Sequence, residues 1–186
     1  MTLIEVRWHG RGGQGVVTVS RLLAQAALLE DKYAQAFPEF GPERLGAPIL
    51  GFTRISEKPI EVHSQVYNPH YVVVLDPTLL GVIDVFKGLI EGGSAVVNIN
   101  KSPEELKSEL KMREDINVFT VDATNIAIDV LGRPIYNTAM LGALIRVSKL
   151  TSLESVKNAT INRFGAELGK RNVAVIERAY KEVSGP

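Results

Sequence analysis

A cluster of glycines near the start of the chain is the first segment whose residue types could bind a ligand. It reads HGRGGQG over residues 9–15, and Gly10, Gly12 and Gly15 follow the spacing G-x-G-x-x-G. An apolar run precedes the cluster and a helical pattern follows it. In that setting the spacing lets a strand turn sharply into a helix and brings backbone N–H groups up to a phosphate. Residues 10–15, named the glycine loop, therefore form a candidate phosphate-binding loop.

Two interpretations of the glycine loop stay open from the residues alone. In the first, the loop cradles a phosphate or pyrophosphate and Arg11 adds a positive charge. In the second, the glycines only relieve crowding in a tight turn. An NAD site would also need an acidic residue at the end of the second strand, where Gln35 and Ala36 stand. Ordinary NAD binding is therefore disfavoured, whereas other nucleotide or coenzyme phosphates fit.

The second candidate segment is PEFGPERLGAP over residues 38–48, named the proline loop. Its three prolines and two glycines preclude regular structure and favour a loop of fixed shape. Near its middle lie Pro42, Glu43 and Arg44. The two charged residues could pair with each other, with a ligand or with another subunit. The residues alone favour a solvated ion pair on a rigid surface loop, which contributes little to stability.

Polar residues also follow several predicted strands. Asp76, Asn98 and Asp122 lie at the carboxyl ends of strands, where open α/β sheets bind ligands. Each is equally placed to cap the helix that follows, and capping is the expected role for all three and for Asn137. No Ser-His-Asp set, metal-ligand cluster or Schiff-base lysine emerges. The sequence therefore predicts no catalytic and no metal-binding residue.

Alternating strand and helix patterns surround these candidate residues. Strands are expected at residues 3–8, 32–37, 49–56, 60–65, 71–75, 94–99 and 118–121. Helices are expected at residues 14–29, 122–131, 138–149, 153–164 and 173–183, with two more starting at Pro77 and Pro103. The helix at Pro77 should bury Leu79, Ile83 and Phe86, and residues 49–56 and 60–65 should pair as a hairpin. Gly142, inside a helix, predicts close packing against another backbone.

These elements predict an α/β fold, a Rossmann-like three-layer sandwich with a mostly parallel sheet, a hairpin insertion and a helical C-terminal third. The 186 residues are expected to form a single domain, with an α/β core over residues 1–135 and a helical part over residues 136–186.

Composition excludes several classes of function. Lys and Arg number 21 and Asp and Glu number 21, so no basic surface for nucleic acid or anionic membrane is expected. No apolar run approaches the roughly 20 residues of a membrane span, and no signal peptide is visible, so a cytoplasmic protein is expected. The chain contains no cysteine, which excludes disulfides, thiolate zinc sites and cysteine-ligated iron–sulfur clusters.

Three segments together resemble a known family. HGRGGQGVVTVSRLLAQAA, QAFPEFGPERLGAPILGFTRIS and NTAMLGAL are similar to the gamma subunit of 2-oxoacid:ferredoxin oxidoreductases, of which pyruvate synthase is the commonest member. The resemblance extends over essentially the whole chain. It implies an assembled enzyme that oxidatively decarboxylates a 2-oxoacid to acyl-CoA and CO2 and reduces ferredoxin.

The resemblance also implies how the work is divided among subunits. Thiamine diphosphate, magnesium and iron–sulfur clusters belong to alpha, beta and delta-type subunits, so this chain alone would bind no cofactor. Its glycine loop would lie near the coenzyme A path, with residues in these roles: a backbone cradle from Gly10, Gly12, Gly13 and Gly15, a phosphate contact from Arg11, and orientation of the loop or of a neighbouring subunit by Gln14. In the proline loop, Glu43 and Arg44 would hold the shape of the loop or contact a partner subunit. The alternative hypothesis is a stand-alone nucleotide-binding module with a regulatory or scaffolding role.

Overall fold

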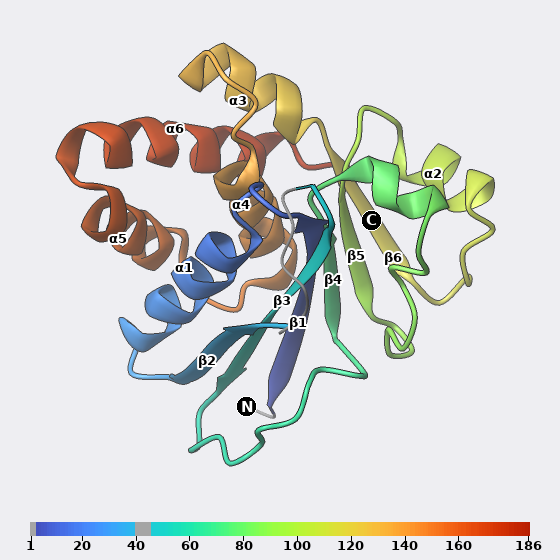
Figure 1. The fold of residues 1–186 in the computed structure, drawn as a ribbon, viewed down its shortest axis with the longest axis horizontal. Helices are drawn as coiled ribbons and strands as arrows, with labels where there is room; N and C mark the ends of the chain where they lie inside the picture. The colour runs from blue at the N-terminus through green and yellow to red at the C-terminus, as the bar shows by residue number, and fades with distance from the viewer. Residues whose placement is uncertain (1–2, 40–45) are drawn as a thin grey trace.

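One mixed sheet organises the computed structural model, which describes residues 3–39 and 46–186. Within these residues the strands are β1 (Ile4–Arg11), β2 (Tyr33–Pro38), β3 (Pro48–Ser56), β4 (Tyr71–Val74), β5 (Ser94–Asn98) and β6 (Asn117–Val121). Their order is β2-β3-β1-β4-β5-β6 (Figure 1). β1, β4, β5 and β6 run parallel, whereas β3 is antiparallel to both β1 and β2. The carboxyl ends of the four parallel strands therefore share one edge.

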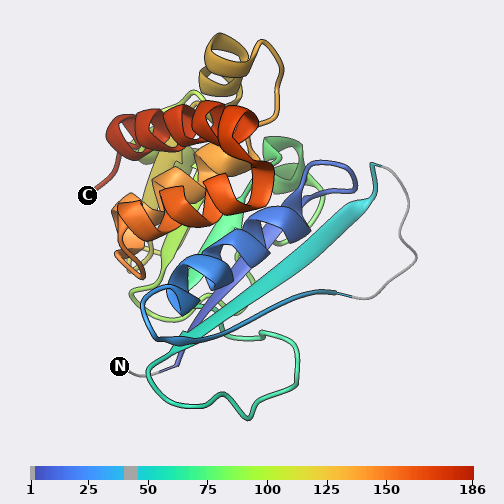
Figure 2. The ribbon, with the colours of Figure 1, turned by 90° about the vertical axis from the view of Figure 1, so that its left-hand side faces the viewer.

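Helices cover both faces of this sheet. They are α1 (Val16–Leu28), the 3-10 helix η1 (Pro77–Gly81), α2 (Pro103–Glu109), α3 (Ala123–Leu131), α4 (Asn137–Ser148), α5 (Leu153–Phe164) and α6 (Ala166–Glu182). Figure 1 shows η1 and α2 on one side, and Figure 2 looks onto the side covered by α1, α5 and α6. The predicted three-layer α/β sandwich is confirmed. No helix in the described ranges is long and apolar enough to span a bilayer.

Alternate residues of the parallel strands face two separate hydrophobic cores, as the two-residue period of a strand requires. Val73 and Val96 pack into the core built with α1, α4 and α6. Val72, Val74 and Val97 pack into the smaller core under η1 and α2. All five valines are fully buried. A sheet covered on both faces explains why β4 is a continuous β-branched run instead of an alternating one.

The two C-terminal helices α4 and α6 cross at very close range. A Cβ placed on Gly142 of α4 would lie 2.3 Å from the carbonyl oxygen of Ile176 in α6. The expectation that Gly142 packs against another backbone is confirmed.

The inserted hairpin differs from the expected one. β3 pairs with β2, and residues 60–65 form no strand. The buried side chain of Arg54 on β3 donates to the carbonyl oxygens of Val62 (3.2 Å) and Ser64 (2.7 Å). Because a side chain holds these carbonyls, the segment stays outside the backbone ladder, and the strand expected at residues 60–65 was wrong.

The helix that begins at Pro77 is also shorter than expected. η1 ends at Gly81 and buries Leu79, but Ile83 lies beyond it and is 36% exposed. The buried Arg7 of β1 donates to the carbonyl oxygens of Val85 and Lys87. These bonds hold the segment after η1 in a non-helical path. The expected helix was therefore too long and Ile83 was wrongly placed on its inner face, although Phe86 packs, partly buried, against the same core as Leu79.

Candidate functional site

The glycine loop joins β1 to α1 at the edge where the parallel strands end. Gly13 has φ +94° and Gly15 has φ +80°, both in the left-handed region that side chains disfavour. A Cβ on Gly10 would lie 2.5 Å from Cγ2 of Val16. The loop shape therefore requires glycine at these positions, independently of any ligand.

The N-terminus of α1 leaves backbone donors free. Gly15 is its N-cap and supplies no side-chain cap. Within residues 3–39 and 46–186, the backbone N–H groups of Val16, Val17 and Thr18 have no hydrogen-bond partner. Free N–H groups and the positive end of the helix dipole together attract an anion. The described part of the loop thus fits a phosphate group.

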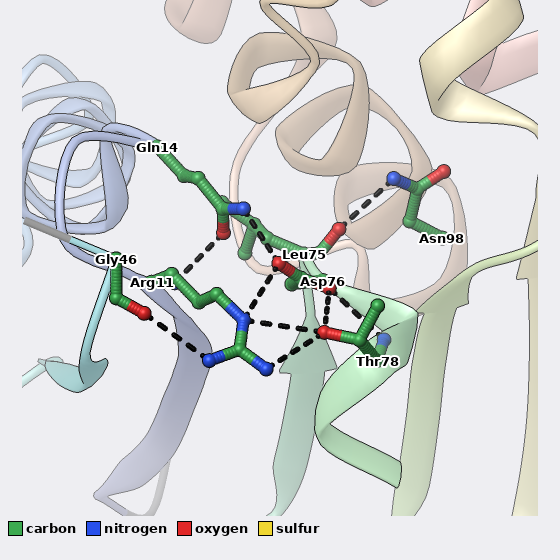
Figure 3. A network of polar contacts seen from close by, with 7 residues as sticks. All are labelled: Arg11, Gln14, Gly46, Leu75, Asp76, Thr78 and Asn98. Carbon is green, nitrogen blue, oxygen red and sulfur yellow. Dashed lines mark hydrogen bonds and ion pairs between the residues drawn. The ribbon is translucent and has the colours of Figure 1, made fainter.

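Gln14 holds the glycine loop to the end of β4. Its Oε1 accepts a hydrogen bond from the backbone N–H of Arg11 at 2.7 Å. Its Nε2 donates to Oδ2 of Asp76 at 2.6 Å (Figure 3). One side chain therefore connects the first turn of the loop with the neighbouring parallel strand.

The guanidinium of Arg11 is already bound within the chain. Its Nε lies 3.2 Å from Oδ2 of Asp76, and Nη2 donates to Oγ1 of Thr78 at 2.8 Å. Nη1 donates to the carbonyl oxygen of Gly46 at 3.1 Å (Figure 3). A phosphate at this loop would therefore meet an arginine whose charge is offset by a carboxylate.

Asp76 performs the capping role expected of it and a second role besides. Its Oδ1 accepts from the backbone N–H of Thr78 at 2.9 Å, which caps η1. Burial would raise the pKa of Asp76, but hydrogen bonds from Thr78 and Gln14 and the charge of Arg11 outweigh burial and lower it. The carboxylate therefore stays ionised. Its bond to the glycine loop was missed, although β1 and β4 are neighbours.

The two motifs singled out by sequence lie side by side. The N–H of Gly12 donates to the carbonyl oxygen of Ala47 at 2.9 Å, and the N–H of Gly46 donates to that of Gly12 at 3.1 Å. These bonds extend the β1–β3 ladder, in which Arg11 pairs with Pro48. The end of the proline loop is thus attached to the glycine loop. Pro42, Glu43 and Arg44 lie outside the described residues.

The expected caps at other strand ends had mixed outcomes. Asp122 caps α3 by accepting from the N–H of Asn125, as predicted. Asn98 does not cap the next helix. Its Nδ2 donates instead to the carbonyl oxygen of Leu75 at 2.9 Å, and its Oδ1 accepts from the N–H of Thr124 at 3.2 Å. Asn98 therefore joins the end of β5 to the end of β4, a bond drawn in Figure 3, and to the first turn of α3.

Asn137 is likewise not a cap. α4 has Tyr136 as its N-cap residue, without a side-chain hydrogen bond. Nδ2 of Asn137 donates to the carbonyl oxygen of Gly15 at 3.4 Å. A Cβ on Gly15 would lie 2.3 Å from that nitrogen. The third segment of the family resemblance therefore packs directly against the glycine loop.

His9 lies buried in β1 immediately before the loop. Its Nε2 accepts a hydrogen bond from Nε of Arg7 at 3.0 Å. Burial, and next the positive charge of Arg7, lower the pKa of His9 to about 3. A neutral imidazole therefore supports the base of the loop at physiological pH.

The family model described as pyruvate ferredoxin/flavodoxin oxidoreductase matches residues 5–182. The chain belongs to this family.

Relatives within the pyruvate ferredoxin/flavodoxin oxidoreductase family match the chain over nearly its full length. The pyruvate/ketoisovalerate oxidoreductases common subunit gamma of Thermococcus litoralis is 49% identical over 180 residues, covering 97% of both chains. The pyruvate synthase subunit PorC of Methanocaldococcus jannaschii is 47% identical over 181 residues, again 97% of both chains. The crystal structure of pyruvate oxidoreductase subunit PORC from Thermotoga maritima has a TM-score of 0.87 at 40% identity, covering 100% of this chain and 99% of that one.

This member of the family has no cysteine, so it cannot ligate an iron–sulfur cluster through thiolates. Across the described part of the chain, no three His, Asp or Glu side chains gather in a way that could hold a metal ion. The glycine loop and the start of α1 suit a ligand, because their glycine geometry is fixed and three N–H groups have no partner among the described residues.

Proposed function

We propose that this chain is the gamma subunit of a 2-oxoacid:ferredoxin oxidoreductase with pyruvate as the oxoacid. The enzyme oxidatively decarboxylates the 2-oxoacid, transfers the acyl group to coenzyme A and reduces ferredoxin. The observation that carries this proposal is the 49% and 47% identity, over 97% of each chain, to proteins named as gamma and PorC subunits. The chain is thus an oxidoreductase subunit that acts within an assembly.

The proposal places thiamine diphosphate, magnesium and the iron–sulfur clusters in alpha, beta and delta-type subunits, with the complex in the cytoplasm. A chain without cysteine is consistent with that division. The chain is proposed to work as one domain, because α4 shares a core with α1 and the sheet. The proline loop, with Pro42, Glu43 and Arg44, is proposed to contact a partner subunit.

The glycine loop is proposed to face the phosphates of coenzyme A. Three N–H groups at the start of α1 that have no hydrogen-bond partner among the described residues support this assignment. The left-handed glycines support it further, because they leave the backbone open to a close approach. Arg11 is proposed to act together with Asp76, since the two side chains form an ion pair.

Isolation of the native complex tests the subunit assignment. The chain should co-purify with a thiamine-binding subunit and a ferredoxin-like subunit, and the complex should reduce ferredoxin with pyruvate and coenzyme A. Recovery of the chain alone, with a bound nucleotide and no such partners, would support the stand-alone nucleotide-binding module instead.

Substitution of Gly13 tests the proposed coenzyme A contact. In the assembled enzyme, Gly13→Ala should raise the KM for coenzyme A, because it adds a side chain to the glycine loop at a φ of +94°. Single-turnover cluster reduction by pyruvate without coenzyme A should change much less. Gly132→Ala is the matched control, since Gly132 has φ +73° and open space around its Cβ position at the end of α3. Equal KM values in the two variants would contradict the assignment.

A further inference from the structure

The carboxylate of Asp76 serves more partners than a helix cap needs. Oδ1 accepts from both the N–H and the hydroxyl of Thr78, at 2.9 and 2.7 Å. Oδ2 accepts from Nε2 of Gln14 at 2.6 Å and lies 3.2 Å from Nε of Arg11 (Figure 3). The residue is only 7% exposed. Capping of η1 accounts for Oδ1 alone, so Oδ2 is directed entirely at the glycine loop.

The amide of Gln14 can satisfy its two partners in only one orientation. Oε1 must face the N–H of Arg11, which is a donor, and Nε2 must face an acceptor. A carboxylate oxygen of Asp76 is that acceptor. The position of Asp76 therefore determines where Gln14 holds the backbone of Arg11, at the entrance to the loop.

We propose that Asp76 is a positioning residue for the coenzyme A site, which holds the glycine loop in its anion-accepting shape through Gln14 and Arg11 without touching the ligand. This inference rests on the proposed function of the glycine loop. The glycine loop would then be supported by a polar residue that follows β4 and lies 62 residues from Gln14 along the chain.

Two single substitutions break this support in opposite ways. Asp76→Asn keeps an oxygen for Thr78 but turns an amide N–H₂ toward Nε2 of Gln14, so two donors face each other. Rotation of the Gln14 amide would only move the conflict to the N–H of Arg11. Gln14→Glu instead places a second carboxylate against Asp76, and the two like charges repel.

The double variant Gln14→Glu/Asp76→Asn exchanges the amide and the carboxylate and restores the two donor–acceptor matches of position 14. The ion pair between Nε of Arg11 and Oδ2 of Asp76 is not restored. The new carboxylate at position 14 accepts from the N–H of Arg11 and from the new amide at position 76. The net charge of the loop region is unchanged. Rescue by this exchange would not occur if Asp76 only capped η1, because Asn is an equally good cap and Gln14 would be irrelevant.

Steady-state kinetics of the assembled enzyme with coenzyme A varied test the proposal. Each single variant should raise the KM for coenzyme A about tenfold with kcat nearly unchanged, since a hydrogen bond to a charged group is lost. The double variant should have a lower KM than the two single effects added together predict, because the contacts of position 14 are restored while the Arg11–Asp76 pair is not. Asp122→Asn is the matched control, because Asp122 caps α3 at another strand end and does not contact the glycine loop.

Two outcomes would overturn the inference. One is an unchanged KM in Asp76→Asn while Gly13→Ala raises it. The other is a double variant no better than the two single effects combined. If Gly13→Ala also leaves the KM unchanged, the proposed coenzyme A contact itself fails, and the positioning role fails with it. Hydrogen exchange of the peptide over residues 9–15 in the intact complex provides a second readout, which should rise in both single variants and recover in the double variant.

Discussion

Arg11 and Gln14 carry most of the polar contacts of the glycine loop, and both use them to hold the loop and not to present a free charge. Arg11 reaches η1 and the end of the proline loop, and Gln14 reaches the end of β4. In the proposed coenzyme A contact, the groups that would face the ligand are the backbone N–H groups at the start of α1, which have no partner among the described residues. At the residue scale, these side chains fix the shape of the loop, and recognition of a ligand is proposed for the backbone.

The buried imidazole of His9 predicts a pH dependence of folding. Its pKa is about 3 in the folded chain, compared with 6.5 ordinarily, because of burial and the charge of Arg7. Below pH 6.5, His9 therefore binds a proton in the unfolded chain but stays neutral in the folded chain. Stability that is present at neutral pH is lost as the pH falls from 6.5 toward 3. This group alone contributes up to about 1.4 kcal/mol per pH unit.

Denaturant unfolding of the isolated chain between pH 7 and 5 measures this effect. His9→Asn should flatten the dependence of the unfolding free energy on pH, whatever its effect at pH 7. His63→Asn, the same substitution at an exposed histidine, is the matched control. An unaltered slope in His9→Asn would show that another group is responsible.

Several residue contacts could be predicted from sequence because their partners lie within three positions. Asp122 caps α3 through Asn125, and Ser102 forms a capping box with Glu105. Asn98 was misassigned because its partners, Leu75 and Thr124, lie 23 and 26 residues away. Local sequence contains the cap pattern but carries no information on such distant partners.

At the element scale, the crossing of α4 and α6 depends on one missing side chain. Gly142→Ala should destabilise the chain by about 1–3 kcal/mol, because the added methyl group meets the backbone of Ile176 and neither helix can yield without repacking. In an unobstructed helix the same change would stabilise by up to about 1 kcal/mol. The sign of the effect therefore reports the close approach.

Thermal or denaturant unfolding of the isolated chain checks this prediction. Gly81→Ala in η1 is the control, because a Cβ at Gly81 meets nothing within 4 Å. It should change the unfolding free energy by less than about 0.5 kcal/mol. A gain in stability from Gly142→Ala would contradict the packing of α4 against α6.

The elements were predictable where hydrophobic pattern alone determines them. The short β-branched run of β4 favours a strand, and the apolar residues of α1 and α5 recur at helical spacing, so these elements could be predicted. Residues 60–65 had the pattern of a strand but are held by the side chain of Arg54. The hydrophobic pattern does not reveal that a buried arginine donates hydrogen bonds to the carbonyl oxygens that a strand would use for pairing.

At the scale of the whole molecule, one sheet edge brings together the segments that carry the family resemblance. The glycine loop follows β1, the proline loop ends at β3, and Asn137 begins α4 against Gly15 (Figure 1). Backbone bonds join the first two directly. A ligand at the glycine loop and a partner subunit at the proline loop would therefore contact adjoining parts of the same surface.

The sequence by itself determined the strands and helices whose apolar period is strong, the glycine positions, the absence of thiolate ligands and the family resemblance. Only the tertiary structure decided that Asp76 and Gln14 meet across 62 residues and Asn137 and Gly15 across 122. The physical reason is that local sequence specifies backbone conformation, whereas side-chain partners depend on the order of strands in the sheet. That order arises from the burial of all apolar faces at once, which no single segment encodes.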